Sequence, residues 1–159
     1  FKMDKFPITK QGFEKLEAEL KNLKSVERPA IIEAIAEARA HGDLSENAEY
    51  HSARERQSFI EGRIMELEGR MSYAEVIDPT ELSGNRVMFG ATVEVVDEDT
   101  DEEFTYQIVG EYEADVDSGK LSNTAPLSRA LIGKSVGDSV EVRTPKGEKA
   151  YEILDVEYK

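Results

Sequence analysis

Residues 34–50 read AIAEARAHGDLSENAEY, and this stretch decides the fold of the chain. It joins two helical patterns through a turn at residues 41–47, where Gly42 is a favourable helix terminator and Asp43 and Ser45 are favourable N-caps. A short connection between two long helices makes them antiparallel neighbours. We therefore predict a helical hairpin whose tip lies at residues 41–47.

Apolar residues on both sides of this turn recur at helical spacing. After the turn, gaps of three and four alternate, which is the a/d seam of a coiled coil with Gln57 as its one polar member. The pattern predicts an antiparallel coiled coil over residues 1–77, about 45 Å long at about 1.5 Å per residue. Pro29 is expected to bend or interrupt the first arm. The seam positions are Phe13, Leu16, Leu20, Leu23, Ile31, Ile35 and Ala38, then Tyr50, Ala53, Gln57, Ile60, Ile64, Leu67, Met71 and Ala74.

The pattern changes from about Asp78, where turn residues mark a linker over residues 78–86. Alternating or β-branched runs then predict strands, and a stretch that begins with Pro126 and stops at Gly133 predicts a short helix. Strands with one short helix indicate a small domain over residues 87–159, an antiparallel sheet with the helix on one face. The fold class is thus α+β. The predicted strands are 92–96, 104–109, 139–143 and 149–156.

The charge balance restricts the function classes that are open to the chain. Its 159 residues contain 34 acidic and 20 basic side chains, a net charge of −14, of which residues 1–77 carry −3 and residues 78–159 carry −11. Such a balance argues against tight, independent nucleic-acid binding and against an anionic membrane surface. The absence of Cys excludes disulfides and thiolate metal sites. With no apolar run of spanning length and no signal peptide, we expect no membrane partner.

The tip carries Asp43 and Glu46 within one exposed turn. Two carboxylates can hold Mg²⁺, but they leave most of its six ligand positions to water or to a partner. The same two residues also fit a capping box that merely stabilises the following helix. Arg39 and Arg54 flank the tip, where they are either contacts for phosphate or ordinary solvated charges. Spacing alone leaves these alternatives open.

The tip sequence, continued through Ala53-Arg54-Glu55, resembles the tip of the bacterial transcript cleavage factors of the GreA/GreB family. Two further blocks, FGATV at residues 89–93 and APLSRALIGK at residues 125–134, resemble the start of the family's C-terminal domain and its short helix. The resemblance spans about residues 4–158, and the near-neutral stem is closer to the GreA type. The chain departs from the family at Ala125, often Ser, and at Ser128, often Ala or Gly.

The resemblance implies an antiparallel coiled coil followed by an FKBP-like domain. It also implies a factor that binds RNA polymerase at the rim of the secondary channel and inserts its coiled coil. The tip would then stimulate the polymerase's own cleavage of backtracked nascent RNA at its 3′ end and rescue arrested complexes. Such a factor is no enzyme itself, has no cofactor of its own and works in the cytoplasm.

The resemblance also implies roles for individual residues. Asp43 and Glu46 match the family's tip acids and would coordinate a Mg²⁺ shared with the polymerase active site. Arg39, Ser45, Arg54 and Pro126 are the expected contacts to RNA or polymerase, and Ser45 could also hydrogen-bond the tip itself or water.

Two functions of other classes stay open. One is a coiled-coil adaptor or inhibitor that binds polymerase without stimulating cleavage, and it predicts that substitution of the tip acids changes nothing. The other is a prolyl isomerase, suggested by the C-terminal fold alone, although fold does not confer activity. The C-terminal half has no Trp to line a proline pocket.

Overall fold

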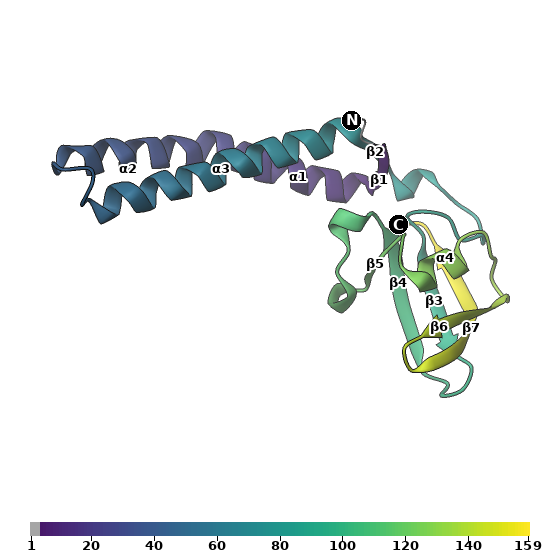
Figure 1. Cartoon of the computed structure of the whole chain (residues 1–159). Coiled ribbons are helices and arrows are strands. Elements are labelled where there is room, and N and C mark those ends of the chain that lie inside the picture. The colour runs from purple at the N-terminus through teal and green to yellow at the C-terminus, as the bar shows by residue number, and fades with distance from the viewer. Residues whose placement is uncertain (1–3) are drawn as a thin grey trace. The chain divides into compact units, whose positions relative to one another are not determined.

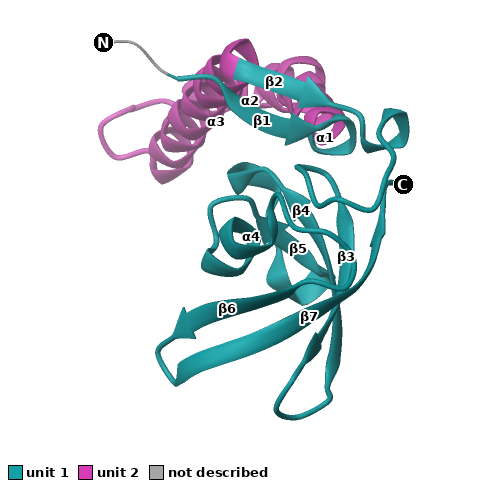
Figure 2. Ribbon diagram, turned by 90° about the vertical axis from the view of Figure 1, so that its right-hand side faces the viewer, with its two compact units in different colours: residues 1–12, 74–159 teal, residues 13–73 magenta. Residues whose placement is uncertain are grey.

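A computed structural model describes residues 4–159 of the chain. The described chain forms two compact units, one of residues 13–73 and the other of residues 4–12 together with 74–159 (Figure 2). The first unit is almost entirely helical and carries the predicted tip. The second contains the strands. Among the described residues, no helix is both long and apolar enough to cross a membrane.

The helical unit is a hairpin of long helices (Figure 1). Its first arm consists of α1 (Lys10–Asn22), a π-helical segment (Leu23–Glu27) and α2 (Arg28–Ala40), and its second arm is α3 (Ala48–Tyr73). The predicted antiparallel hairpin with a turn at residues 41–47 is therefore confirmed. Its apolar core is a cluster of buried seam residues, Leu23, Ile60, Ile64 and Leu67.

The predicted interruption near Pro29 is a π-helical segment that ends just before it. Proline lacks the N–H of a helical hydrogen bond, and its ring crowds the carbonyl of the residue four positions earlier, here Ser25. In the wider turn, the Arg28 N–H donates to the carbonyl of Leu23, five residues back. Such a turn inserts one extra residue, which explains why Leu23 and Ile31 are separated by eight positions instead of the seven of a heptad.

The helical pattern predicts a helix up to about Ile77, and this end point is wrong. Helix α3 stops at Tyr73, and β2 (Ala74–Ile77) pairs in parallel with β1 (Phe6–Thr9), a strand that the sequence pattern does not indicate. Ala74 is therefore a strand residue and not the last member of the seam. The β-branched Val76 and Ile77 favour an extended backbone once a partner strand is available.

A carboxylate joins this ribbon to the rest of its unit. Glu113 accepts a hydrogen bond from the Thr9 N–H at 2.8 Å and another from the Gly110 N–H at 2.9 Å, and it is also bonded to the Thr9 hydroxyl. The Phe6 ring meets Tyr112 edge-on, with ring centroids 5.1 Å apart. These contacts explain why residues 4–12 group with the C-terminal part of the chain.

The second unit is built on a five-stranded sheet in the order β5-β4-β3-β7-β6. All four predicted strands are present, and the predicted helix is α4 (Pro126–Leu131). Leu131, Val93 and Ile108 lie in its core, completely or almost completely buried. The predicted antiparallel sheet is wrong in one respect, because β5 pairs in parallel with β4. The strands are β3 (Thr92–Asp97), β4 (Glu103–Val109), β5 (Lys120–Ser122), β6 (Ser139–Thr144) and β7 (Gly147–Glu157), with 3₁₀ turns at Pro79–Glu81, Glu111–Glu113 and Val116–Ser118.

Candidate functional site at the hairpin tip

The tip loop, residues 41–47, leaves α2 through a glycine turn. The His41 N–H donates to the carbonyl of Ala38 at 3.2 Å and the Gly42 N–H to that of Arg39 at 3.3 Å. Gly42 has φ +110°, a backbone conformation that only glycine adopts without strain. The chain therefore turns sharply here, and residues 42–46 are exposed.

Asp43 is held in a defined orientation by its own loop. Its Oδ1 accepts hydrogen bonds from the Ser45 hydroxyl at 2.8 Å and from the Ser45 N–H at 3.0 Å. These two donors, the hydroxyl first, lower the pKa of Asp43 below the ordinary value for aspartate. Of the partners expected for Ser45, the structure shows the tip itself, because its hydroxyl and its N–H both donate to Asp43.

Glu46 is exposed in the same loop and makes no hydrogen bond or ion pair with any residue between 4 and 159. Its carboxylate is free to bind something outside the chain. Within this described range, no cluster of three or more His, Asp or Glu side chains is able to hold a metal ion. Two carboxylates alone fit a metal whose other ligands come from a partner, and they do not fit a resident ion.

The capping-box interpretation of Asp43 and Glu46 is wrong, because α3 begins later than that motif requires. Helix α3 starts at Ala48, so the N-cap is Asn47. The Asn47 Oδ1 accepts the hydrogen bond of the Tyr50 N–H at 3.0 Å, the usual N-cap contact. Glu46 precedes the cap and is not needed for the helix.

Sequence reasoning did not single out Asn47. Its signal is the preference of asparagine for N-cap positions. That signal is ambiguous here because Asp43 and Ser45, which share the preference, stand close before it.

The two predicted arginines lie near the tip on one side of the hairpin. Arg39, at the end of α2, and Arg54, on α3, line the same open groove of about 380 Å³ between the helices, together with Ile32, Ile35, Ala36 and Gln57. The Arg39 guanidinium also lies over the Tyr50 ring, 5.9 Å from its centroid. Neither arginine forms an ion pair with a residue in the described part of the chain. Both positive charges therefore remain available.

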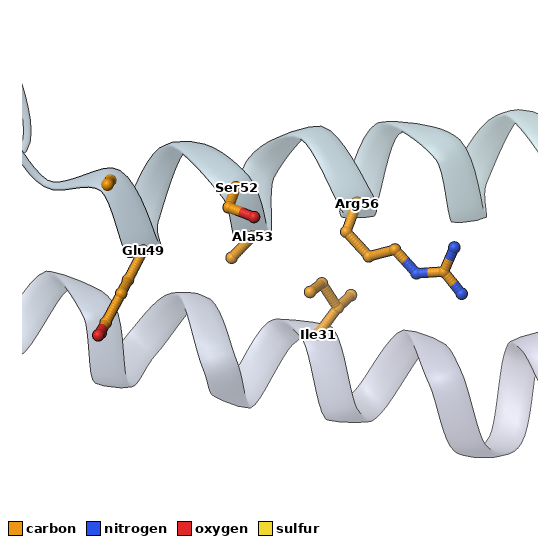
Figure 3. A pocket seen from close by; sticks show the side chains of 6 residues that line it. Ile31, Glu49, Ser52, Ala53 and Arg56 are labelled. Atoms are coloured by element: carbon orange, nitrogen blue, oxygen red, sulfur yellow. The ribbon is translucent and has the colours of Figure 1, made fainter.

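A second groove lies between the same helices. Figure 3 shows Glu49 and Arg56 reaching from α3 towards α2, and Ile31 reaching back from α2. The remaining lining residues, Ala48, Ser52 and Ala53, are small, and they leave a volume of about 480 Å³. The helices are thus incompletely packed where they approach the tip.

Comparison with known proteins matches both parts of the chain. Residues 6–76 match the domain described as transcription elongation factor, N-terminal, and residues 82–158 match the one described as transcription elongation factor, GreA/GreB, C-terminal. This chain belongs to the GreA/GreB family of transcription elongation factors.

Named relatives in this family are similar over almost their whole length. The transcription elongation factor GreA of Ruegeria pomeroyi is 70% identical over 156 residues, which are 98% of this chain and 99% of the relative. GreA of Caulobacter vibrioides is 65% identical with the same coverage. Among solved structures, the GreA factor homolog Gfh1 of Thermus thermophilus is 28% identical, covers 96% of this chain and 98% of its own, and has a TM-score of 0.43, which adds nothing to the assignment.

Pro126, the remaining predicted contact, lies in the unit that contains the five-stranded sheet. It is exposed at the first position of α4, behind Ala125, which caps the helix without a side-chain hydrogen bond. Ser128, the second departure from the family pattern, is fully buried, and its hydroxyl has no hydrogen-bond partner among the described residues. Nothing in the structure explains this hydroxyl.

Proposed function

We propose that this chain is an elongation factor that binds RNA polymerase and stimulates cleavage of backtracked nascent RNA. In this proposal residues 87–159 dock at the rim of the secondary channel, and the hairpin enters the channel with its tip leading. The observation that carries the proposal is the tip loop itself, which presents two exposed carboxylates, one of them held in a defined orientation by Ser45. Family membership supports the same conclusion.

The tip acids would act as ligands supplied to another protein's active site. Asp43 and Glu46 would complete the coordination of a Mg²⁺ that the polymerase holds incompletely, and they would accept hydrogen bonds from the attacking water and orient it. When bound, such an ion delivers hydroxide and stabilises the charge that develops in phosphodiester hydrolysis. Ser45 keeps Asp43 aligned for this task. The chain would hydrolyse no RNA alone, because it offers only two of six ligands.

The arginines and Pro126 would have supporting roles. Arg39 and Arg54 carry free positive charge on one side of the hairpin near the tip, where they would bind phosphates of the extruded RNA 3′ segment. Pro126, exposed on α4, would contact the polymerase surface. The proposal places the protein in the cytoplasm, where bacterial transcription takes place.

The test is an RNA cleavage assay on stalled polymerase complexes. We expect Asp43→Ala and Glu46→Ala each to lose most of the stimulation at unchanged polymerase affinity. Glu55→Ala, which removes an exposed carboxylate from the stem of α3, is the matched control and should behave like the wild type. Undiminished cleavage by both tip variants would reject the role of metal ligand and favour the adaptor function.

A further inference from the structure

We propose that Asn47 is a positioning residue for the tip carboxylates, because its side chain closes the loop that carries them. This inference rests on the proposed function, since it assigns the residue that holds Asp43 and Glu46 in a productive arrangement. Asn47 itself is not placed in contact with metal, water or RNA.

The Asn47 amide connects the two ends of the hairpin turn. Its Nδ2 donates to the carbonyl of Ala38, in the last turn of α2, at 2.6 Å. Its Oδ1 accepts from the N–H of Tyr50, in the first turn of α3, at 3.0 Å. The stretch of chain between Ala38 and Asn47 contains both tip acids. One side chain thus fixes the separation of the two helix ends from which the loop is suspended.

The loop has few other restraints. Leu44, its one large apolar side chain, is 37% exposed and does not belong to the apolar cluster of the hairpin. The contact between Asp43 and Ser45 is internal to the loop and does not attach it to either helix. The His51 Nε2 lies 3.3 Å from the Ser45 carbonyl, a long hydrogen bond at an exposed site. Because apolar packing is also weak beside both grooves, the loop geometry depends on the Asn47 bridge.

Asparagine is suited to both contacts because its amide carries a donor and an acceptor on one short side chain. Serine is also a good N-cap, but it has no group that reaches the Ala38 carbonyl. Asn47→Ser therefore keeps the cap of α3 and removes only the bridge, whereas Asn47→Ala removes both. Asn22, an exposed asparagine at the end of α1 without a side-chain cap contact, provides a matched control substitution.

The experiment measures RNA cleavage in stalled polymerase complexes at saturating factor over a series of Mg²⁺ concentrations. For Asn47→Ser we expect a loss of about 10-fold at low Mg²⁺, the usual effect of removing a group that orients metal ligands, and recovery as Mg²⁺ is raised. Helical circular dichroism and polymerase affinity should match those of the wild type. Asn22→Ser should show no change in any of these quantities.

The outcomes separate this inference from the function on which it rests. If Asn47→Ser cleaves like the wild type at every Mg²⁺ concentration while Asp43→Ala is inactive, the positioning role is wrong and the proposed function stands. A loss that Mg²⁺ does not relieve, or one accompanied by reduced helix content or polymerase affinity, assigns Asn47 a structural role only. If Asp43→Ala and Glu46→Ala both retain full stimulation, both proposals are overturned.

Discussion

The base half of the hairpin (residues 13–30 and 56–73) and its tip half (residues 31–55) are built by different means. The base half contains the apolar cluster of Leu23, Ile60, Ile64 and Leu67. Within the tip half, all of whose residues are described, Ile35 and Ala38 alone are buried, and open grooves flank the helices. Hydrophobic stabilisation, which scales with buried apolar area, is therefore concentrated away from the tip.

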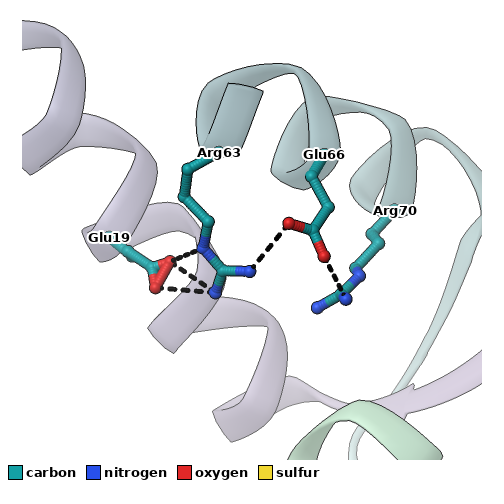
Figure 4. A network of polar contacts seen from close by, with 4 residues as sticks. All are labelled: Glu19, Arg63, Glu66 and Arg70. Atoms are coloured by element: carbon teal, nitrogen blue, oxygen red, sulfur yellow. Dashed lines mark hydrogen bonds and ion pairs between the residues drawn. The ribbon is translucent and has the colours of Figure 1, made fainter. Parts of the chain in front are cut away.

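The ion pairs follow the same division. In the base half, Arg63 makes a bidentate contact with Glu19, at 2.9 and 2.8 Å, and continues through Glu66 to Arg70 (Figure 4). Three further ion pairs cross between the two arms of the hairpin. No residue of the tip half, residues 31–55, forms an ion pair with another described residue. The comparison teaches that the base half provides the stability of the hairpin. The charged groups of the tip half form no ion pair with another described residue and are available to a partner. These further pairs are Lys24–Glu68, Glu27–Arg56 and Arg28–Glu61.

The largest expected effect is that of a cavity in the base half. Leu67 is completely buried, so Leu67→Ala should lower the free energy of unfolding of the hairpin by about 3 kcal/mol. Ile35→Ala should cost about 1 kcal/mol less, because Ile35 borders a groove and its loss leaves no closed cavity. Denaturant unfolding followed by the helical circular dichroism signal measures both. Equal costs would remove the distinction between the two halves.

A smaller effect is expected from the charged network. Arg63→Met should destabilise the hairpin by about 1 kcal/mol at low salt, since its partners are partly exposed and screened by water. Most of this difference should disappear at about 1 M salt, where the Debye length is about 3 Å. Arg54→Met, in the tip half, removes a guanidinium without an ion pair and should show no such salt dependence. Salt-dependent destabilisation in both variants would contradict the comparison.

Filling the tip seam should have a still smaller effect of opposite sign. Gln57 is a polar seam residue that lines the groove beside Ile35. Gln57→Leu should extend the apolar seam towards the tip and raise the free energy of unfolding by about 0.5 kcal/mol. Hydrogen exchange of the amides at the end of α2 should slow accordingly, with those around Leu67 unchanged. Unaltered exchange near the tip would show that packing there does not limit its stability.

The division between the halves also separates what the sequence predicts from what it does not. The periodic seam and the turn at Gly42 predict the hairpin because both depend on neighbours within a few residues. The pairing of β1 with β2 is missed because it joins two four-residue segments on either side of the hairpin, and no local pattern records a distant partner. β5 is missed because it is only three residues long.

For the candidate site, the sequence pattern alone is compatible with two roles of Asp43 and Glu46, metal binding and helix capping. The structure removes capping, because Asn47 is the cap. Asn47 also donates a hydrogen bond to the Ala38 carbonyl, nine residues earlier. No local sequence pattern indicates this contact, so the sequence alone does not reveal that Asn47 is the cap of α3.

The smallest expected effect lies in the loop and concerns charge instead of folding. The Ser45 hydroxyl is the main cause of the lowered pKa of Asp43, so Ser45→Ala should raise that pKa towards its ordinary value without reaching it, since the amide donor remains. Because the folded-state pKa is lowered, the associated stability is present above the ordinary aspartate pKa and is lost as the pH falls through the folded-state value. Ser45→Ala should therefore narrow the pH range, between the ordinary and the folded-state pKa of Asp43, over which this stability is lost.

A nuclear magnetic resonance titration of the carboxyl carbons measures the shift, and the chain contains its own control. Asp78 accepts hydrogen bonds from the hydroxyl and N–H of Thr80, at 2.7 and 3.0 Å, and its pKa is lowered by the same kinds of donor. In Ser45→Ala the pKa of Asp78 should not move, whereas Thr80→Val should raise it and leave Asp43 unchanged. If the pKa of Asp43 stays where it is in Ser45→Ala, the loop does not hold this carboxylate through the hydroxyl. The defined geometry of the tip loop would then come from its backbone and from Asn47 alone.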